Sequence, residues 1–302
     1  MLEKMLSSVH EKFKIENKKL KIILSAFFAG GNILFTDDPG TGKTTLSKII
    51  ADVLDLNYKR VQFTPDISPS DVLGVNVFNL QKQQWELHEG PVFTDILLVD
   101  EINRAAPRTQ SALLEAMAEK QITIDKIEYS LGRDFFVMAT QNPLEEMGVF
   151  DLPSAQKDRF MINVGLNNLS EDDEMQIMLG KFNYSKTEAV LSRDEITDIR
   201  KQIESMIVPE TVLKYALKIV KKTREHTSIQ KGVSTRAAQD LIKLSKAYAY
   251  MDDKKAVEHD HIFELAPFVF PHRLVLKDEY FTSNPEEIII SLLKEEHINY
   301  EK

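Results

Sequence analysis

Two adjacent carboxylates, Asp100 and Glu101, follow directly on the branched apolar run Ile96-Leu97-Leu98-Val99. A short apolar run of this kind is typical of a buried parallel strand, because helices cover both of its faces. Open α/β sheets bind their ligands at the carboxyl ends of such strands. At that position one carboxylate can hold Mg²⁺, and its neighbour can orient or deprotonate an attacking water. On these residues alone, a strand that ends in a solvated acidic turn is the alternative.

A second stretch, Gly40-Thr41-Gly42-Lys43-Thr44, has the residue types that hold a triphosphate. Its glycines let backbone amides close on phosphate oxygens, and the helix that follows adds the partial positive charge of its N-terminus. Lys43 is expected to reach the β- and γ-phosphates, and the hydroxyl of Thr44 is expected to bind Mg²⁺. The predicted nucleotide-binding residues are Asp38, Pro39, Gly40, Thr41, Gly42, Lys43, Thr44 and Thr45.

The loop departs from the usual phosphate-loop pattern at Asp37, where that pattern has glycine, and Asp38 adds a second negative charge. A carboxylate about 6 Å from the nucleotide would repel it electrostatically. This repulsion would weaken the free energy of binding by roughly 2–3 kcal/mol at an effective dielectric constant of about 20, before screening. We therefore predict that Asp37→Gly tightens ATP binding, by up to roughly tens-fold. Equal ATP dissociation constants for the parent and the variant, measured by calorimetry, would contradict this prediction.

The sequence predicts alternating strands and helices around the acidic pair and the phosphate loop. An opening helical segment ends at Gly30-Gly31, and the phosphate loop precedes a helix over residues 46–54. Five short segments predict the strands of a parallel sheet, at residues 33–35, 58–63, 96–99, 135–140 and 161–164. Two pairs of alternating segments predict inserted β-hairpins, 75–78 with 84–87 and 122–124 with 127–129.

The pattern changes near residue 170, after which helical periodicity dominates. Ser170 with Asp173 and Ser192 with Glu195 are capping-box patterns, which mark helix starts. Further helices are predicted at 210–226, 234–251, 261–269 and 286–295. We therefore expect two domains, an α/β nucleotide-binding core over residues 1–168 and an all-helical domain over residues 169–302.

The composition excludes several classes of protein. Without cysteine there can be no disulfide, thiolate metal site or cysteine nucleophile. Lys plus Arg number 38 against 47 Asp plus Glu, and the net charge of −9 argues against sequence-independent binding of nucleic acid. The N-terminal segment lacks the apolar core of a signal peptide, and the run 22–35 is too short to span a bilayer. We expect a cytoplasmic protein with no membrane span.

At this point the chain resembles the MoxR-type AAA+ ATPases, nearly from end to end. The first blocks that carry the resemblance are Phe63-Thr64-Pro65-Asp66, Gly90-Pro91-Val92-Phe93, the run from Asp100 to Ala105 and the run from Thr109 to Met117. Later blocks are Ala139-Thr140-Gln141-Asn142-Pro143, the run from Leu152 to Phe160, Gly232-Val233-Ser234-Thr235-Arg236-Ala237 and His272-Arg273. The resemblance implies a P-loop AAA+ core, with a parallel five-stranded sheet and two inserted hairpins, followed by an all-α lid.

The resemblance also implies a role for each candidate residue. Asp100 would hold Mg²⁺, and Glu101 would position and activate the water that attacks the γ-phosphate. Asn142 matches the sensor 1 position, and Arg236 matches sensor 2. Arg159 matches the arginine finger, which reaches the ATP of a neighbouring subunit in this family and offsets charge in the transition state.

For the protein as a whole, the resemblance implies a homo-oligomeric ring, expected to be a hexamer. This ring would remodel or assemble a protein client. The implied partner is a protein with a von Willebrand factor A (VWA) domain. Two other functions stay open on the sequence. Asp37 and Asp38 suggest a nucleotide-gated binding module with little hydrolysis, and AAA+ relatives include nucleic-acid motors and loaders, which the net charge of −9 disfavours. The two hairpins are candidates for contact with the client.

Overall fold

The apolar run before the acidic pair forms strand β5 (Ile96–Asp100) in the computed structural model, and all five of its residues are buried. The structure describes residues 2–36, 40–142, 148–166, 171–180, 185–280 and 282–300. Contacts divide the chain into two compact units, which are described one at a time. The first comprises Met1–Asn17, Leu34–Leu152 and Gly165–Arg193, and the second comprises Lys18–Ile33, Pro153–Val164 and Asp194–Lys302. The predicted boundary at residue 168 lies outside the described residues and stays a prediction.

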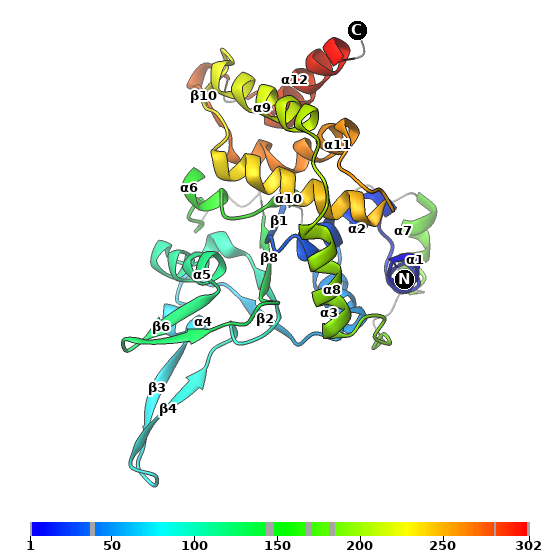
Figure 1. The fold of residues 1–302 in the computed structure, drawn as a ribbon. Helices are drawn as coiled ribbons and strands as arrows, with labels where there is room; N and C mark the ends of the chain where they lie inside the picture. The colour runs from blue at the N-terminus through cyan, green and yellow to red at the C-terminus, as the bar shows by residue number, and fades with distance from the viewer. Residues whose placement is uncertain are drawn as a thin grey trace. The chain divides into compact units, whose positions relative to one another are not determined.

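β5 lies inside a parallel five-stranded sheet, as the sequence predicts. The other strands are β1 (Ile33–Thr36), β2 (Tyr58–Gln62), β8 (Phe136–Gln141) and β9 (Ile162–Val164), and their order is β2-β5-β8-β1-β9. β5 pairs in parallel with both β2 and β8, and its last residue, Asp100, is aligned with Gln62 of β2. Because the carboxyl ends of parallel strands meet at one edge, the acidic pair lies beside the ends of both neighbours. Figure 1 labels β1, β2 and β8 of this sheet.

The helices of the first unit are α1 (Leu2–His10), α3 (Lys43–Val53), α4 (Pro69–Leu73), α5 (Pro107–Glu119) and α7 (Glu171–Met178). α3 begins at the phosphate loop itself, and it buries Leu46, Ile49, Ile50 and Val53, whose spacing of three and four residues places them on one face. α5 starts with proline at its first position, where the missing N–H costs no helical hydrogen bond.

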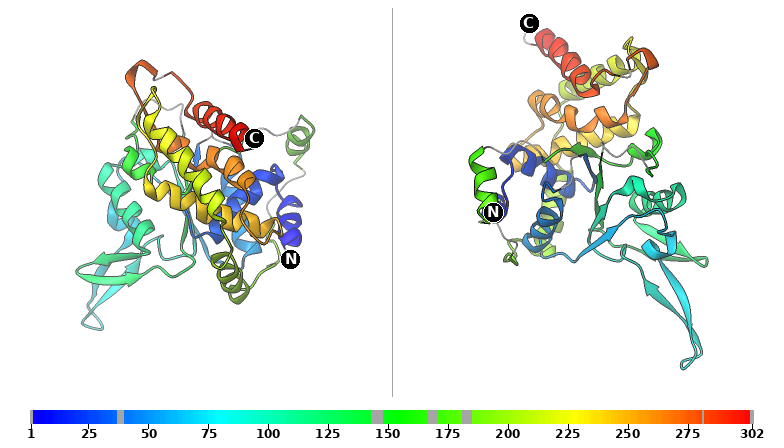
Figure 2. Two further views of the ribbon diagram at one scale, coloured as in Figure 1. Left: turned by 45° about the horizontal axis from the view of Figure 1, so that its top comes forward. Right: turned by 180° about the vertical axis from the view of Figure 1, so that it is seen from behind.

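Both predicted hairpins are present in the first unit, as β3 (Gly74–Asn79) with β4 (Gln84–Glu89) and β6 (Gln121–Ile124) with β7 (Ile127–Ser130). Two glycines meet at the base of the first hairpin. A Cβ atom on Gly90 would lie 2.3 Å from the carbonyl oxygen of Val72 and 2.6 Å from the amide of Gly74, so only glycine fits there. Figure 2 shows both hairpins from two further sides.

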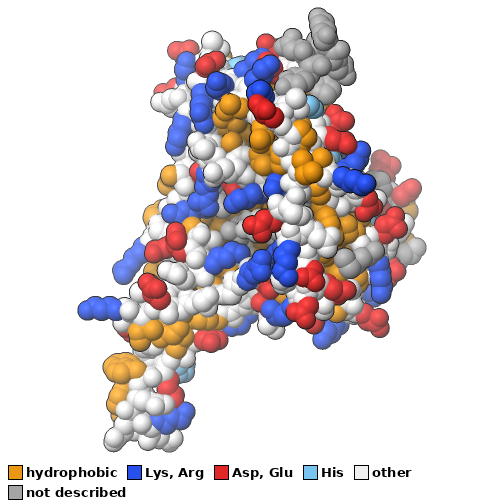
Figure 3. All heavy atoms as spheres, viewed as in Figure 1, with side chains coloured by type: hydrophobic (Ala, Val, Ile, Leu, Met, Phe, Trp, Pro, Cys, Tyr) orange, Lys and Arg blue, Asp and Glu red, His pale blue; other side chains and the backbone are white. Residues whose placement is uncertain are grey.

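The β3–β4 hairpin exposes apolar side chains, which is unusual for a short ribbon. The exposed residues are Val75, Val77, Phe78, Leu80 and Trp85. The rings of Phe78 and Trp85 pack edge to face, with 5.4 Å between their centroids. Trp85 is nevertheless 69% exposed. Figure 3 shows hydrophobic side chains gathered along this hairpin. An exposed apolar surface of this kind is typical of a site of interaction with another protein.

The second unit is mainly helical. Its helices are α2 (Asn17–Phe28), α6 (Ser154–Lys157), α8 (Arg193–Glu204), α9 (Glu210–Glu225), α10 (Thr235–Met251), α11 (His259–Val269) and α12 (Pro285–Tyr300). α8 starts directly after Ser192, where the capping pattern predicts a helix start. Tyr215 of α9 and Phe270 at the end of α11 are fully buried, and they belong to the core of this unit.

Three elements differ from the pattern expected from the sequence. The opening helical segment is two helices, α1 and α2, because residues 11–16 interrupt it. The short helix α4 lies in a stretch rich in turn formers, and a capping box at Ser68 and Asp71 starts it. The helical region also contains a small antiparallel ladder between β10 (Ile229–Lys231) and β11 (Val275–Leu276). Elements this short carry too few residues for a periodic signal.

His272 gives the second unit a predicted dependence of stability on pH. Burial and the neighbouring Arg273 guanidinium lower the pKa of His272 to about 3, and its Nε2 lies 3.0 Å from the carbonyl oxygen of Phe160. The unfolded chain takes up a proton below about pH 6.5, whereas the folded chain does not, so the free energy of unfolding falls as the pH drops from about 6.5 toward 3. The slope for this one residue is about 1.4 kcal/mol per pH unit.

We therefore expect His272→Gln to lose less stability than the parent on going from pH 7.5 to pH 5, by about 2 kcal/mol. Burial also lowers the pKa of His261, so part of the pH dependence persists in the variant. Urea unfolding at several pH values measures the effect, with His88→Gln on the exposed part of the hairpin as the control. Parallel pH profiles for the parent and His272→Gln would contradict the prediction.

Candidate functional site

The phosphate loop and the ends of β2, β5 and β8 enclose one cavity of about 370 Å³ in the first unit. Its lining residues are Gly40, Thr41, Gly42, Lys43, Thr44, Thr45, Arg60, Gln62, Asp100, Glu101, Thr140, Gln141 and Asn142. The structure therefore brings together most of the candidate residues that the sequence predicts. Asp38 and Pro39 lie outside the described residues, as does Asp37.

The phosphate loop is shaped by two glycines with left-handed backbone conformations, Gly40 at φ 87° and Gly42 at φ 83°. Only glycine adopts this conformation without strain. Gly42 also caps α3, and a Cβ atom there would lie 2.6 Å from the ring of Phe13. α3 therefore begins with Lys43 at the cavity, so the partial positive charge of the helix N-terminus lies where a phosphate would bind.

Asp100 forms an ion pair that the sequence did not predict. The Nε of Arg60, on β2, lies 2.5 Å from Oδ2 of Asp100, whose residue is 8% exposed. The hydrogen bond with Asp100 raises the pKa of Arg60. The side chain of Arg60 is half-exposed, so it can leave the carboxylate when a divalent cation competes for the same oxygen.

Glu101 is held beside Asp100 by backbone conformation and by two partners. Its φ of 55° is left-handed, which turns the chain sharply at the end of β5 and separates the two carboxylates. Its N–H donates to Oγ1 of Thr140 at 2.9 Å, and that hydroxyl lies 3.5 Å from Oδ1 of Asp100. The carboxylate of Glu101 is paired with Nε of Arg104 at 2.8 Å. Thr140 therefore fixes the spacing of the acidic pair from the neighbouring strand.

The turn after the acidic pair is anchored by a buried amide. Gln110 of α5 is fully buried, and its Nε2 donates to the carbonyl oxygens of Ile102, Ala105 and Phe150 at 3.0–3.3 Å. The N–H of Phe150 donates to the carbonyl oxygen of Asn103 at 2.6 Å. These bonds satisfy polar backbone groups that would otherwise be buried without partners, and they make the turn that carries Arg104 rigid.

The two remaining candidates, Arg159 and Arg236, belong to the second unit. Arg159 lies just after α6 and is half-buried, and Arg236 is exposed in the first turn of α10. Neither side chain forms an ion pair with any residue that the structure describes.

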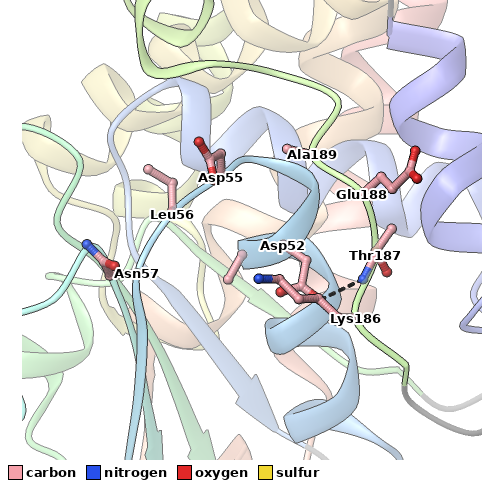
Figure 4. A pocket seen from close by; sticks show the side chains of 9 residues that line it. Asp52, Asp55, Leu56, Asn57, Lys186, Thr187, Glu188 and Ala189 are labelled. Atoms are coloured by element: carbon pink, nitrogen blue, oxygen red, sulfur yellow. Dashed lines mark hydrogen bonds between the residues drawn. The ribbon is translucent and has the colours of Figure 1, made fainter.

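A second cavity, of about 550 Å³, lies near the C-terminal end of α3 in the first unit (Figure 4). Its charged lining residues are the carboxylates of Asp52, Asp55 and Glu188 and the amine of Lys186. The N–H of Thr187 donates to Asp52 at 3.0 Å. The excess of negative charge and the adjoining C-terminus of the helix both disfavour a phosphate ligand. This larger cavity is therefore not the nucleotide site.

Two family models match the chain. Residues 32–162 match the model of the ATPase family associated with various cellular activities (AAA), and residues 221–291 match the AAA lid domain. The first match covers the phosphate loop, the acidic pair, Asn142 and Arg159. The second covers Arg236 and Arg273. No described helix has the length and apolar character that crossing a membrane requires.

Similar proteins are known by sequence and by structure. The uncharacterized protein YeaC of Bacillus subtilis is 40% identical over 85% of this chain and 81% of its own length. Chaperone MoxR1 of Mycobacterium tuberculosis is 30% identical over 92% of this chain and 77% of its own length. A crystal structure from Cytophaga hutchinsonii, described provisionally as that of an ATPase, superposes with a TM-score of 0.89 at 34% identity. That match covers 97% of this chain and 93% of the other.

Proposed function

Because the chain belongs to the MoxR-type AAA+ ATPases, we propose that it hydrolyses ATP in a Mg²⁺-dependent reaction and uses that reaction to remodel or assemble a protein client. One observation carries the proposal. A single cavity contains a phosphate loop, a strand-end pair of carboxylates and Asn142, which follows the next strand of the sheet. These parts come from three segments that span about a hundred residues of the sequence, and together they are what phosphoryl transfer to water needs.

The residues present fit both ATP and Mg²⁺. The left-handed Gly40 leaves room for phosphate oxygens, because a Cβ atom there would meet no atom within 4 Å, and Lys43 lines the same cavity at the start of α3. The hydroxyl of Thr44 and the carboxylate of Asp100 line the same cavity, and hard oxygen ligands of this kind suit Mg²⁺. When bound, Mg²⁺ would neutralise charge on the phosphates. Thr44 and Asp100 would hold it, once Arg60 has released the Asp100 oxygen.

Each of the chain's own residues at this site has a separate proposed role in ATP hydrolysis. Glu101 orients the attacking water and accepts its proton, and Asn142 holds the water or the γ-phosphate from the adjoining strand. Lys43 and the amides at the start of α3 offset the negative charge that the phosphates carry. Thr140 keeps Glu101 in place through the hydrogen bond to its amide.

Two residues of the second unit complete the proposed site. We assign Arg159 as the arginine finger, which supplies positive charge to the ATP of a neighbouring subunit, and Arg236 as sensor 2. The finger assignment requires a ring of subunits, for which a hexamer is the expected form, whereas Arg236 can act on the ATP of its own subunit or of a neighbour. The exposed apolar β3–β4 hairpin is the proposed contact with the client, and a VWA-domain protein is the proposed partner.

One observation favours the second candidate function, a nucleotide-gated binding module with little hydrolysis. Both carboxylates of the acidic pair are engaged by arginines, Asp100 by Arg60 and Glu101 by Arg104. If these pairs persisted with ATP bound, Glu101 would not reach the water. A module of this kind would bind ATP and change its partners, yet release phosphate only at the background rate.

A phosphate-release assay separates the two functions. The ATPase proposal expects turnover that needs Mg²⁺ and exceeds the rate of the Glu101→Gln variant, whereas the binding module expects equal rates for the two proteins. Size-exclusion chromatography with and without ATP tests the ring, and co-purification with VWA-domain proteins tests the partner. Stimulation of the ATPase by nucleic acid would instead favour a nucleic-acid motor.

A further inference from the structure

The buried guanidinium of Arg273 binds backbone carbonyls and two carboxylates within the second unit. Arg273 is 3% exposed, and its Nη2 donates to the carbonyl oxygen of Phe160 at 2.6 Å and to Asp240 at 2.8 Å, with Met161 O at 3.3 Å. Its Nη1 forms an ion pair with Asp158 at 3.3 Å. Burying a cation is costly unless it is paired, and here two carboxylates pair with it. One is on α10, and the other lies immediately before Arg159.

Asp158 also contacts the start of α10 directly. The hydroxyl of Ser234 lies 3.0 Å from both carboxylate oxygens of Asp158. The same hydroxyl accepts the N–H of Ala237 at 3.0 Å, which is the N-cap bond of α10. A continuous set of polar contacts therefore connects the residue before Arg159 to the cap of the helix whose first turn carries Arg236.

We propose that Asp158 is a positioning residue, which holds Arg159 and Arg236 in one fixed arrangement through its contacts with Arg273 and Ser234. The inference rests on the proposed function, because it assumes that Arg159 acts on ATP. Asp158 touches no reacting atom in this scheme. It determines where the backbone of Arg159 lies relative to α10, so any displacement of α10 that accompanies nucleotide binding displaces the arginine finger by the same amount.

A purely structural role for these contacts predicts something different. In that case each lost contact would lower the melting temperature and leave the turnover of the folded protein unchanged. A positioning role predicts that the contact made by Asp158 affects turnover, whereas the contact made by Asp240 affects stability only. The chain offers a matched pair of variants for this test, since both carboxylates pair with the same guanidinium.

The experiment compares Asp158→Asn with Asp240→Asn in the full-length protein. We expect Asp158→Asn to lower kcat at least about tenfold, with KM for ATP within twofold of the parent, because small displacements of catalytic groups are costly. We expect Asp240→Asn to lower the melting temperature at least as much, because Asp240 is the more buried carboxylate, yet to keep kcat within twofold. Equal kcat for the parent and Asp158→Asn would overturn the inference.

A double-mutant cycle with Arg159→Ala decides whether Asp158 acts through the finger. If it does, Asp158→Asn has no further effect on kcat in the Arg159→Ala background, and additive losses would overturn the inference. Unchanged kcat in Arg159→Ala alone would instead contradict the finger assignment of the proposed function. If Asp158→Asn fails to fold, Ser234→Ala takes its place, because it removes the contact between Asp158 and the start of α10 at a cost of about 1 kcal/mol in helix-cap stability. A parental kcat in Ser234→Ala would then count against the inference.

Discussion

Glu101→Gln retains ATP and lowers the rate of phosphate release at least about a hundredfold. The amide cannot accept the proton of the attacking water, and general-base catalysis by a positioned carboxylate contributes roughly 10²–10⁴-fold to such reactions. Binding persists because the phosphate loop, Lys43 and Asp100 are unchanged. Single-turnover phosphate release measures the loss, and equilibrium binding of a fluorescent ATP analogue confirms that the site still fills.

The control for Glu101→Gln is Arg104→Gln. Glu101→Gln removes the charge that pairs with Arg104 at 2.8 Å, so part of its effect could come from a loosened turn. Arg104→Gln breaks the same ion pair but leaves the carboxylate in place. The catalytic role of Glu101 therefore requires Glu101→Gln to be far slower than Arg104→Gln. Similar rates for the two variants would show that the ion pair, and not the general base, limits turnover.

The sheet and the phosphate loop could be predicted because their signals are local. Residues 96–99 are apolar without interruption, and such a run has few alternatives to a buried strand. The two left-handed positions of the loop are both glycine, so the turn can be recognised from the residues alone. The carboxylates after the run then define the edge of the sheet where a ligand binds.

The ion pair between Arg60 and Asp100 could not be predicted, because its partners are 40 residues apart in the sequence. Only the alignment of β2 with β5 brings them together, and the residues of β2 are mostly polar. Gln110 was missed for a different reason. Helical periodicity assigns a polar residue of an amphipathic helix to the solvent, but the buried carbonyls around Gln110 need a donor.

The contacts of Arg273 show the same limit in the second unit. The block His272-Arg273 matches the family pattern, but a match carries no information on what the guanidinium touches. Its partners Asp158 and Asp240 are separated from it by more than a hundred residues and by 33 residues. The carboxylates that pair with this cation are distant in the sequence, so they can be identified only from the way the helices pack in the structure.

Arg159→Ala lowers kcat roughly 10³-fold while ATP binding changes little. An arginine finger contributes about 10³–10⁵-fold to phosphoryl transfer, because it offsets charge that develops only in the transition state. Arg159→Lys is the matched control: it keeps the charge but loses the planar fork of donors, so we expect its rate to lie between those of the parent and Arg159→Ala. Steady-state kinetics give the split between kcat and KM.

Mixing Arg159→Ala with Glu101→Gln tests whether the finger acts between subunits. Each variant alone is expected to hydrolyse ATP far more slowly than the parent. In a mixed ring, a Glu101→Gln subunit still carries Arg159, and it can offer that side chain to a neighbouring Arg159→Ala subunit whose Glu101 is intact. We therefore expect the mixture to hydrolyse ATP faster than either variant. A finger that served its own subunit would give no such recovery, because every site with Glu101 would lack Arg159.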